Sequence, residues 1–179
     1  MTSCNNGQEC LNQPFRVELP YPVIKAQKQN SFYGCLLYED YAGEGSEFTA
    51  TASYMHHSIV TASMNEEISC LLRQIGIAEM THISMLGKLL TTLGCSPKFQ
   101  TNTDGKQADW NASCLTYNTS LKTILAGLIN GEEAAIEQYQ DHIKKINDCY
   151  VTAVLERIVL DEQLHYSTLK YYYDKYIIC

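Results

Sequence analysis

The sequence predicts an all-α protein: an antiparallel four-helix bundle with a long crossover between its second and third helices. Three observations support this fold class. Four long stretches show the helical periodicity of apolar residues, the prolines gather near the N-terminus, and one long polar connection lies in the middle of the chain. Its 179 residues suit one domain with one core. We therefore expect an extended N-terminal arm over residues 1–30 and a bundle over residues 31–179.

The elements follow in order along the chain. The arm contains three of the four prolines, Pro14, Pro20 and Pro22, which favour an extended conformation. Helical periodicity then predicts four helices, over residues 31–62, 65–94, 118–147 and 149–178. Asn65, which two glutamates follow, is a typical N-cap for the second helix, and Gly94 is a typical stop.

The connections between these helices predict how they pack. Only a few residues join the first helix to the second and the third to the fourth, so each pair should form an antiparallel hairpin. The crossover, residues 95–117, is long enough to run the length of such a helix at roughly 3.3 Å per residue. We interpret Trp110, the only tryptophan, as the apolar anchor of this crossover.

The second and fourth helices interrupt their apolar core seams with the same motif, Glu-x-x-His. The seam of the second helix reads Ile68, Leu72, Ile75, Glu79, His82, Leu86, Leu89 and Leu93. The seam of the fourth reads Val151, Leu155, Ile158, Glu162, His165, Leu169, Tyr172 and Tyr176. Because residues three apart share a helix face, both side chains of each motif can reach one point.

The first and third helices share a second pattern, Glu-x-x-Ala-x-x-x-Tyr-x-x-His. Its members are Glu47, Ala50, Tyr54 and His57 in the first helix, and Glu132, Ala135, Tyr139 and His142 in the third. Along the chain, these two sets are almost as far apart as the two Glu-x-x-His motifs are from each other. This internal repeat predicts two hairpins related by a pseudo-twofold axis, with space beside the small alanines.

Four glutamates in core seams require cations. Burial of one unpaired charge costs several kcal/mol, and the seams offer no lysine or arginine as a partner. One polar residue in a seam is more often a paired structural residue, but two divalent cations would neutralise all four glutamates together. Oxygen-rich ligands with some imidazole suit iron or manganese. The sequence therefore predicts two iron or two manganese ions per chain, bound by Glu47, Glu79, His82, Glu132, Glu162 and His165.

These motifs resemble those of the ferritin-like superfamily over about residues 31–178. Its members include bacterioferritin, rubrerythrin, manganese catalase and the spore-coat proteins similar to that catalase. The resemblance rests on Ser46-Glu47 with Tyr54, Glu79 to His82, Glu132 with Tyr139, and Asp161 to His165. It implies that Glu79 and Glu162 bridge the metals, that Glu47 and Glu132 are terminal ligands, and that each ion binds one histidine. It also implies that Tyr54 and Tyr139 hydrogen-bond the carboxylates.

Some residues depart from the family or from the repeat. Ala135 stands where rubrerythrins carry an extra glutamate, and no Cys-x-x-Cys pair offers a rubredoxin-type iron site, so the built-in electron relay of rubrerythrins is not expected and an external electron donor is one alternative. Asp161 precedes the second Glu-x-x-His motif but Ala78 precedes the first, so the two metals need not be equivalent. We interpret His57 and His142 as paired core histidines, with proton transfer as the alternative.

Composition limits the surroundings of the protein. A net charge of −7 argues against nucleic acid or an anionic membrane as the partner. No apolar run approaches the ~18 residues of a membrane span, and the N-terminus lacks signal-peptide features, so a cytoplasmic location is expected. In a reducing compartment the eight cysteines are expected to be free thiols.

The leading functional hypothesis is an oxidoreductase that consumes hydrogen peroxide or O₂ at the metal centre, like a peroxidase or catalase. Metal coordination acidifies bound water and peroxide, which makes proton transfer feasible at neutral pH. One alternative is iron handling by a ferroxidase centre, as in ferritins. Another is a structural component of a spore coat that retains the metal site. A homo-oligomer is expected.

Overall fold

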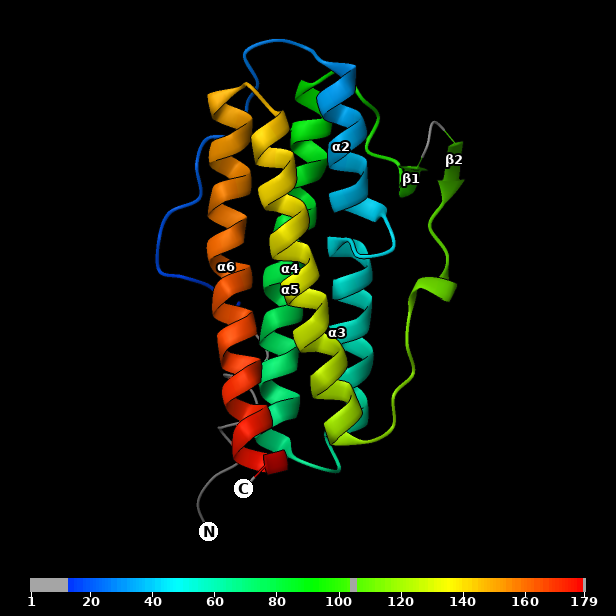
Figure 1. Cartoon of the computed structure of the whole chain (residues 1–179), viewed down its shortest axis with the longest axis vertical. Coiled ribbons are helices and arrows are strands. Elements are labelled where there is room, and N and C mark those ends of the chain that lie inside the picture. The colour runs from blue at the N-terminus through cyan, green and yellow to red at the C-terminus, as the bar shows by residue number, and fades with distance from the viewer. Residues whose placement is uncertain (1–12, 104–105, 179) are drawn as a thin grey trace.

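The computed structural model describes residues 13–103 and 106–178, and it is the helical bundle that the sequence predicts (Figure 1). Its long helices are α4 (Glu66–Thr92), α5 (Leu121–Lys145) and α6 (Cys149–Tyr173). The remaining position in the bundle is filled by α2 (Ser31–Ala42) and α3 (Glu47–Thr61), and α6 continues into a π-helical turn, η2 (Asp174–Ile178). α3 packs on α4 and α5 packs on α6, so both predicted hairpins form.

The expectation of one continuous helix over residues 31–62 was wrong. The backbone N–H of Gly43 donates to the carbonyl of Glu39 (3.1 Å) and closes α2, and the side chain of Ser46 caps the first turn of α3. A Cβ atom at position 43 would lie 2.6 Å from the Glu39 carbonyl oxygen, so this break between the two helices depends on glycine. As a result, Glu47 opens a new helix instead of lying within a long one.

The predicted ends of α4 are confirmed. The side chain of Asn65 accepts a hydrogen bond from the backbone N–H of Ile68 at 3.1 Å. Gly94 has a φ of 83°, the left-handed conformation that commonly ends a helix.

The crossover contains secondary structure that the periodicity did not predict. It comprises β1 (Gln100–Thr103), β2 (Lys106–Asp109) and the short 3₁₀-helix η1 (Ala112–Cys114). The two strands are antiparallel, with Gln100 opposite Asp109. Trp110 anchors the crossover to α3 as expected, because its ring contacts Phe48 edge-on at 4.7 Å. Its indole N–H also donates to the Thr49 hydroxyl at 2.9 Å.

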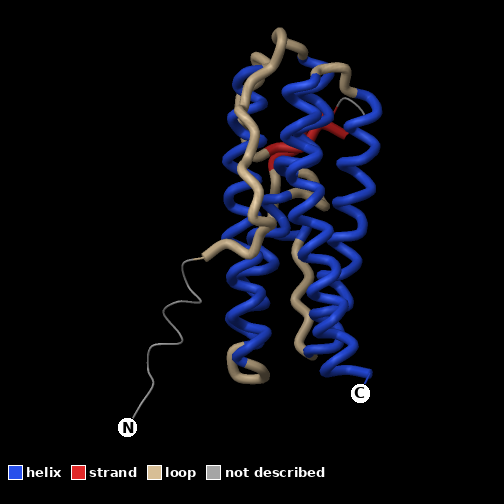
Figure 2. Tube along the Cα trace, turned by 90° about the vertical axis from the view of Figure 1, so that its left-hand side faces the viewer, coloured by secondary structure: helices blue, strands red, loops and turns tan. Residues whose placement is uncertain are grey.

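The arm has neither helix nor strand over residues 13–30, and it follows the outside of the bundle (Figure 2). Its first part is tied to α4 by the Phe15 N–H, which donates to the Gln74 carbonyl at 3.0 Å. Its later part is tied to the start of α6 by the Gln27 N–H, which donates to the Asp148 carboxylate at 2.7 Å. Residues 1–12 of the predicted arm lie outside the described residues.

A polar layer divides the bundle core into two apolar clusters. One cluster includes Leu37, Leu86, Leu155 and Val151, and the other includes Leu72, Ile124, Leu125 and Leu169. Between these clusters lie the Glu-x-x-His motifs of α4 and α6 and, on α5, Glu132. The apolar clusters therefore hold the four helices in register on both sides of the polar layer.

Two findings concern the environment of the chain. Among the described residues, no helix combines the length and apolarity needed to cross a bilayer.

Cys95, Cys114 and Cys149 are free thiols, but Cys70 is disulfide-bonded, which corrects the expectation of a free thiol at that position. A disulfide requires two Cβ atoms within about 4.5 Å, a condition set by the tertiary structure that cysteine spacing does not reveal.

Candidate metal centre

The two Glu-x-x-His motifs face each other from α4 and α6. Within each motif the spacing of three residues brings the side chains together on one face. The Nδ1 atom of His82 lies 2.9 Å from the Glu79 carboxylate, and the Nδ1 atom of His165 lies 3.2 Å from the Glu162 carboxylate. The motifs also interlock, because each Nδ1 atom lies close to the glutamate of the other helix, at 3.0 and 3.1 Å.

All six predicted ligands meet in the polar layer and are buried. Their exposed fractions run from 0% for both histidines to 5% for Glu47 and Glu132. Their ligand atoms form two overlapping groups within 4.8 Å of one another: Glu47, Glu79, His82 and Glu162, and Glu79, Glu132, Glu162 and His165. Glu79 and Glu162 belong to both groups, the position that two bridging carboxylates would take.

The donor set fits divalent cations. Each histidine Nδ1 atom faces several carboxylate oxygens, but a single N–H can donate fully to only one of them. The Oε1 atoms of Glu79 and Glu162 make no hydrogen bond of good geometry, although a histidine Nδ1 atom that they share with other carboxylates lies 3.1 and 3.0 Å away. Buried carboxylate oxygens that share too few donors are costly unless a cation lies between them. Oxygen-rich coordination with one imidazole per ion is typical of iron and manganese.

The pKa shifts show how this cluster is charged when no cation balances it. Burial and the charge of Glu162 raise the pKa of Glu47 and of Glu132 well above the ordinary value for glutamate. Against the effect of burial, the adjoining charges lower the pKa of the other two glutamates and raise the pKa of both histidines. Protons therefore supply positive charge to this cluster, and a cation that binds there would have to displace them.

Two tyrosines connect the halves of the cluster crosswise. The hydroxyl of Tyr54 on α3 donates to Glu132 on α5, and the hydroxyl of Tyr139 on α5 donates to Glu47 on α3. Burial and the nearby carboxylates raise the pKa of both tyrosines well above 10, so both remain protonated donors. Each half of the repeat thus orients the glutamate of the other half.

The outer nitrogens of the two histidines have different partners. The Nε2 atom of His82 lies 3.1 Å from the carboxylate of Asp161, whereas the Nε2 atom of His165 lies 2.7 Å from the backbone carbonyl of Phe15 in the arm. Against the effect of burial, His82 and Arg157 lower the pKa of Asp161 to about 2. The sequence indicated Asp161 but gave no sign of Phe15, because a backbone carbonyl carries no residue-type signal.

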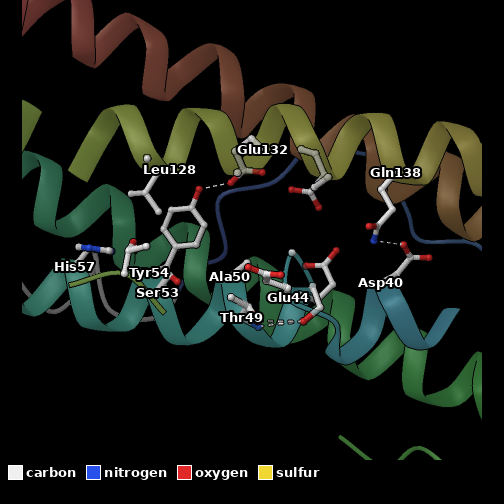
Figure 3. Close-up of a pocket in the computed structure, with 18 of the residues that line it drawn as sticks. Asp40, Glu44, Thr49, Ala50, Ser53, Tyr54, His57, Leu128, Glu132 and Gln138 are labelled. Atoms are coloured by element: carbon white, nitrogen blue, oxygen red, sulfur yellow. Dashed lines mark hydrogen bonds between the residues drawn. The ribbon is translucent and has the colours of Figure 1, made fainter. Parts of the chain in front are cut away.

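A cavity of about 160 Å³ lies between α3 and α5 and reaches the cluster (Figure 3). Glu47, Glu132 and Glu162 contribute to its wall. Ala50 and Ala135 also line it, in agreement with the expected space beside the small alanines. The cavity is large enough for several water-sized molecules and gives them access to the carboxylates.

The two further histidines on these helices differ from each other. His142 is paired as expected: its Nδ1 atom lies 2.9 Å from Asp40, which also accepts a hydrogen bond from Gln138 at 2.8 Å. The expectation of a paired histidine was wrong for His57, which lines the cavity with only 2% of its surface exposed. Neither of its ring nitrogens makes a hydrogen bond of good geometry with the described residues, although the Ser53 backbone is close enough to act on its pKa.

Comparison with known proteins gives the family and the fold. The rubrerythrin family model matches residues 43–173. A manganese catalase from Anabaena superimposes with a TM-score of 0.80 at 23% identity, covering 90% of this chain and 80% of that one. Bacterioferritins from Desulfovibrio desulfuricans (TM-score 0.67, 22% identity, 82% of each chain) and Mycobacterium tuberculosis (0.69, 20%, 83% and 88%) share the fold as well. No curated protein sequence gives a significant match.

Proposed function

The chain belongs to the rubrerythrin family, and on that premise we propose that it is an oxidoreductase whose two iron or manganese ions consume hydrogen peroxide or O₂. One observation carries the proposal: four carboxylates and two imidazoles, all buried, converge in two groups that share Glu79 and Glu162. Bound in this way, a redox-active ion pair supplies two electrons together and acidifies the oxygen ligands it holds.

The protein would hold one ion between Glu47 and His82 and the other between Glu132 and His165, with the shared glutamates between them. The tyrosine hydroxyls fix the two terminal carboxylates in the orientation that faces the ions. The surrounding helices exclude bulk water, because all six ligands are at most 5% exposed. Electrostatic interactions are therefore stronger at this site than at the surface.

The cavity supports a small oxidant as the substrate. It reaches the cluster along the side formed by Glu47, Glu132 and Glu162, and its wall there is polar. Peroxide and O₂ are close in size to water and fit a cavity of about 160 Å³. Carboxylates at the wall are in position to hold or release the protons that oxygen reduction consumes.

The source of electrons divides the proposal into two reactions. The sequence has no Cys-x-x-Cys pair for a rubredoxin-type iron site, so electrons come either from an external donor or from peroxide itself. The first case is a peroxidase and the second is a catalase. Both place the same demands on the six ligands.

The test combines metal analysis with peroxide consumption. Protein purified and loaded with iron or manganese should retain two ions per chain, and Glu79→Ala should retain none. Peroxide loss with O₂ release and no reductant indicates a catalase, whereas loss that requires a reductant indicates a peroxidase. Two retained ions in Glu79→Ala, or no turnover in either assay, would count against the proposal.

Iron handling is the second candidate, because bacterioferritins share the fold and the cavity is acidic, with Asp40 and Glu44 in its wall. Ferrous ions would enter such a cavity more readily than anions. Mineral storage requires a hollow shell, so light scattering distinguishes the candidates. A particle no larger than a small oligomer, without ferric mineral after iron oxidation, would exclude storage.

A further inference from the structure

We infer that the N-terminal arm completes the metal centre from outside the bundle and makes its two metal positions unequal. The inference rests on the proposed function, because it assumes that the six core residues bind metal. It assigns Phe15, Val17 and Tyr21 a positioning role for His82 and His165. None of these three arm residues belongs to a metal-ligand motif in the sequence.

The arm acts on His165 directly. The Phe15 carbonyl can only accept a hydrogen bond, so at 2.7 Å it requires a proton on the Nε2 atom of His165. The Nδ1 atom, which lies 3.1 Å from Glu79, is then the ring nitrogen that would give up its proton and bind a cation. The carbonyl is itself held in place, since the Phe15 N–H donates to Gln74 at 3.0 Å and the Phe15 ring lies 6.2 Å from the imidazole. The arm thus selects the tautomer that can bind a cation.

The arm acts on His82 through Asp161. This carboxylate, which is fully buried, accepts hydrogen bonds from the Val17 N–H at 2.7 Å and the Tyr21 hydroxyl at 2.8 Å. Its Oδ2 atom also lies 3.1 Å from the Nε2 atom of His82. Two of the groups that orient Asp161 toward the histidine therefore belong to the arm.

A buried arginine fastens the arm to α6. Arg157, which is 5% exposed, donates from Nη2 to the carbonyls of Val17 and Leu19 at 2.9 and 3.0 Å. Its Nη1 atom lies 2.7 Å from Asp161, and its guanidinium lies 4.4 Å from the centre of the Tyr21 ring. A buried guanidinium needs such acceptors, so it favours the docked arm over a released one.

The repeat explains why the two positions differ. The same offset that relates Glu79 to Glu162 equates Ala78, which has no acceptor side chain, with Asp161. The Phe15 carbonyl takes the place of the missing carboxylate. A charged acceptor makes an imidazole a stronger ligand than a neutral one does, so the ion beside His82 should bind more tightly.

The experiment measures each position alone. Glu132→Gln removes one ligand from the group that contains His165, and Glu47→Gln removes one from the group that contains His82. In each background, Mn²⁺ binding is measured by equilibrium dialysis on the full-length chain. Tighter binding is expected in Glu132→Gln, where the position beside His82 is intact.

Two arm variants are then added to each background. Phe15→Gly, which removes the aromatic anchor and loosens the carbonyl, should weaken Mn²⁺ binding about 10-fold in Glu47→Gln but not in Glu132→Gln. Tyr21→Phe, which removes the hydroxyl that holds Asp161, should show the opposite selectivity. Lys25→Ala is the control, because the Lys25 ammonium lies over the Tyr150 ring at 3.8 Å, farther along the arm than the residues that contact the histidines.

The selectivity separates positioning from general loss of stability, which would weaken both positions together. Equal losses in both backgrounds, or unchanged binding with both arm variants, would overturn the inference. Wild-type protein that binds no metal would instead refute the proposed function. Two bound ions with no effect of the arm would refute the arm inference alone.

Discussion

The two histidines beyond the metal centre, His57 on α3 and His142 on α5, have equivalent positions in the repeat and opposite surroundings. His142 is paired with Asp40 on α2 at 2.9 Å, whereas His57 faces the cavity without a hydrogen bond among the described residues. The offset that relates His57 to His142 also equates Asp40 with Leu125, which is fully buried and has no acceptor. The two halves therefore differ at this position: one has a carboxylate and the other a leucine.

At the metal centre the halves remain alike. Tyr54 and Tyr139 make the same hydrogen bond in opposite directions, and each half contributes two glutamates and one histidine to the cluster. Around these ligands the halves differ in the outer partners of His82 and His165, in a helix break and in the partner of the further histidine. The comparison indicates that the symmetry of the bundle is kept in the six candidate ligands and relaxed in the residues around them.

The largest expected effect is on the metal content, which should fall further when a shared ligand is removed than when an unshared one is. Glu162 belongs to both ligand groups, so Glu162→Ala should reduce the metal content from two ions per chain to none. Glu132 belongs to one group, so Glu132→Gln should keep one ion. Metal analysis after gel filtration measures both. One retained ion in Glu162→Ala would show that the two positions do not share this carboxylate.

An intermediate effect tests the crosswise hydrogen bonds. Tyr54→Phe and Tyr139→Phe each remove one donor to a glutamate of the other half, and each should weaken metal binding about 10-fold to 100-fold. Because the two bonds are equivalent in the repeat, the two losses should be similar. Titration with Mn²⁺ measures the loss of affinity in each variant. A loss in only one variant would show that the two halves are not equivalent even at the candidate metal centre.

The smallest effect concerns the stability of the metal-free protein at different pH. Burial would lower the pKa of His142, but Asp40 and Glu39 raise it above 6.5, so its stabilising contribution is present below pH 6.5 and lost as pH rises through the raised pKa. Burial and the neighbouring His56 lower the pKa of His57, so this residue destabilises the fold as pH falls below 6.5.

Glutamine variants test these opposite signs. At pH 5.5, His142→Gln should lower the free energy of unfolding relative to wild type, and His57→Gln should raise it. At pH 8 both differences should be smaller. Urea unfolding with a chelator present measures them, and a shift of the same sign in both variants would show that the two sites are alike after all.

Much of this architecture was predictable because the residues that pack in the core of a helical bundle recur in the sequence with the period of the helix. Glu79 and His82, like Glu162 and His165, lie on their seams at a spacing of three, so their meeting in the core followed from helix geometry. The caps at Asn65 and Gly94 were also visible, since each depends on one residue type in one local conformation.

Other features could not be predicted from the sequence because no periodic pattern of residues causes them. The break at Gly43 interrupts a seam whose register continues across it, so the pattern alone could not show two helices. The unpaired state of His57 could not be predicted from its own helix, because its motif matches that of His142, which has a carboxylate partner on another helix. The β hairpin in the crossover forms from polar residues that show no alternation of apolar side chains.

The sequence by itself determined the four-helix bundle and the six acidic and imidazole groups of its core, because burial and helical spacing constrain residue types locally. Only the tertiary structure decided which histidine lacks a partner and that the Phe15 carbonyl meets His165 at 2.7 Å. Contacts made by backbone groups, or between residues far apart in the chain, depend on where segments pack in space, and no local pattern encodes that.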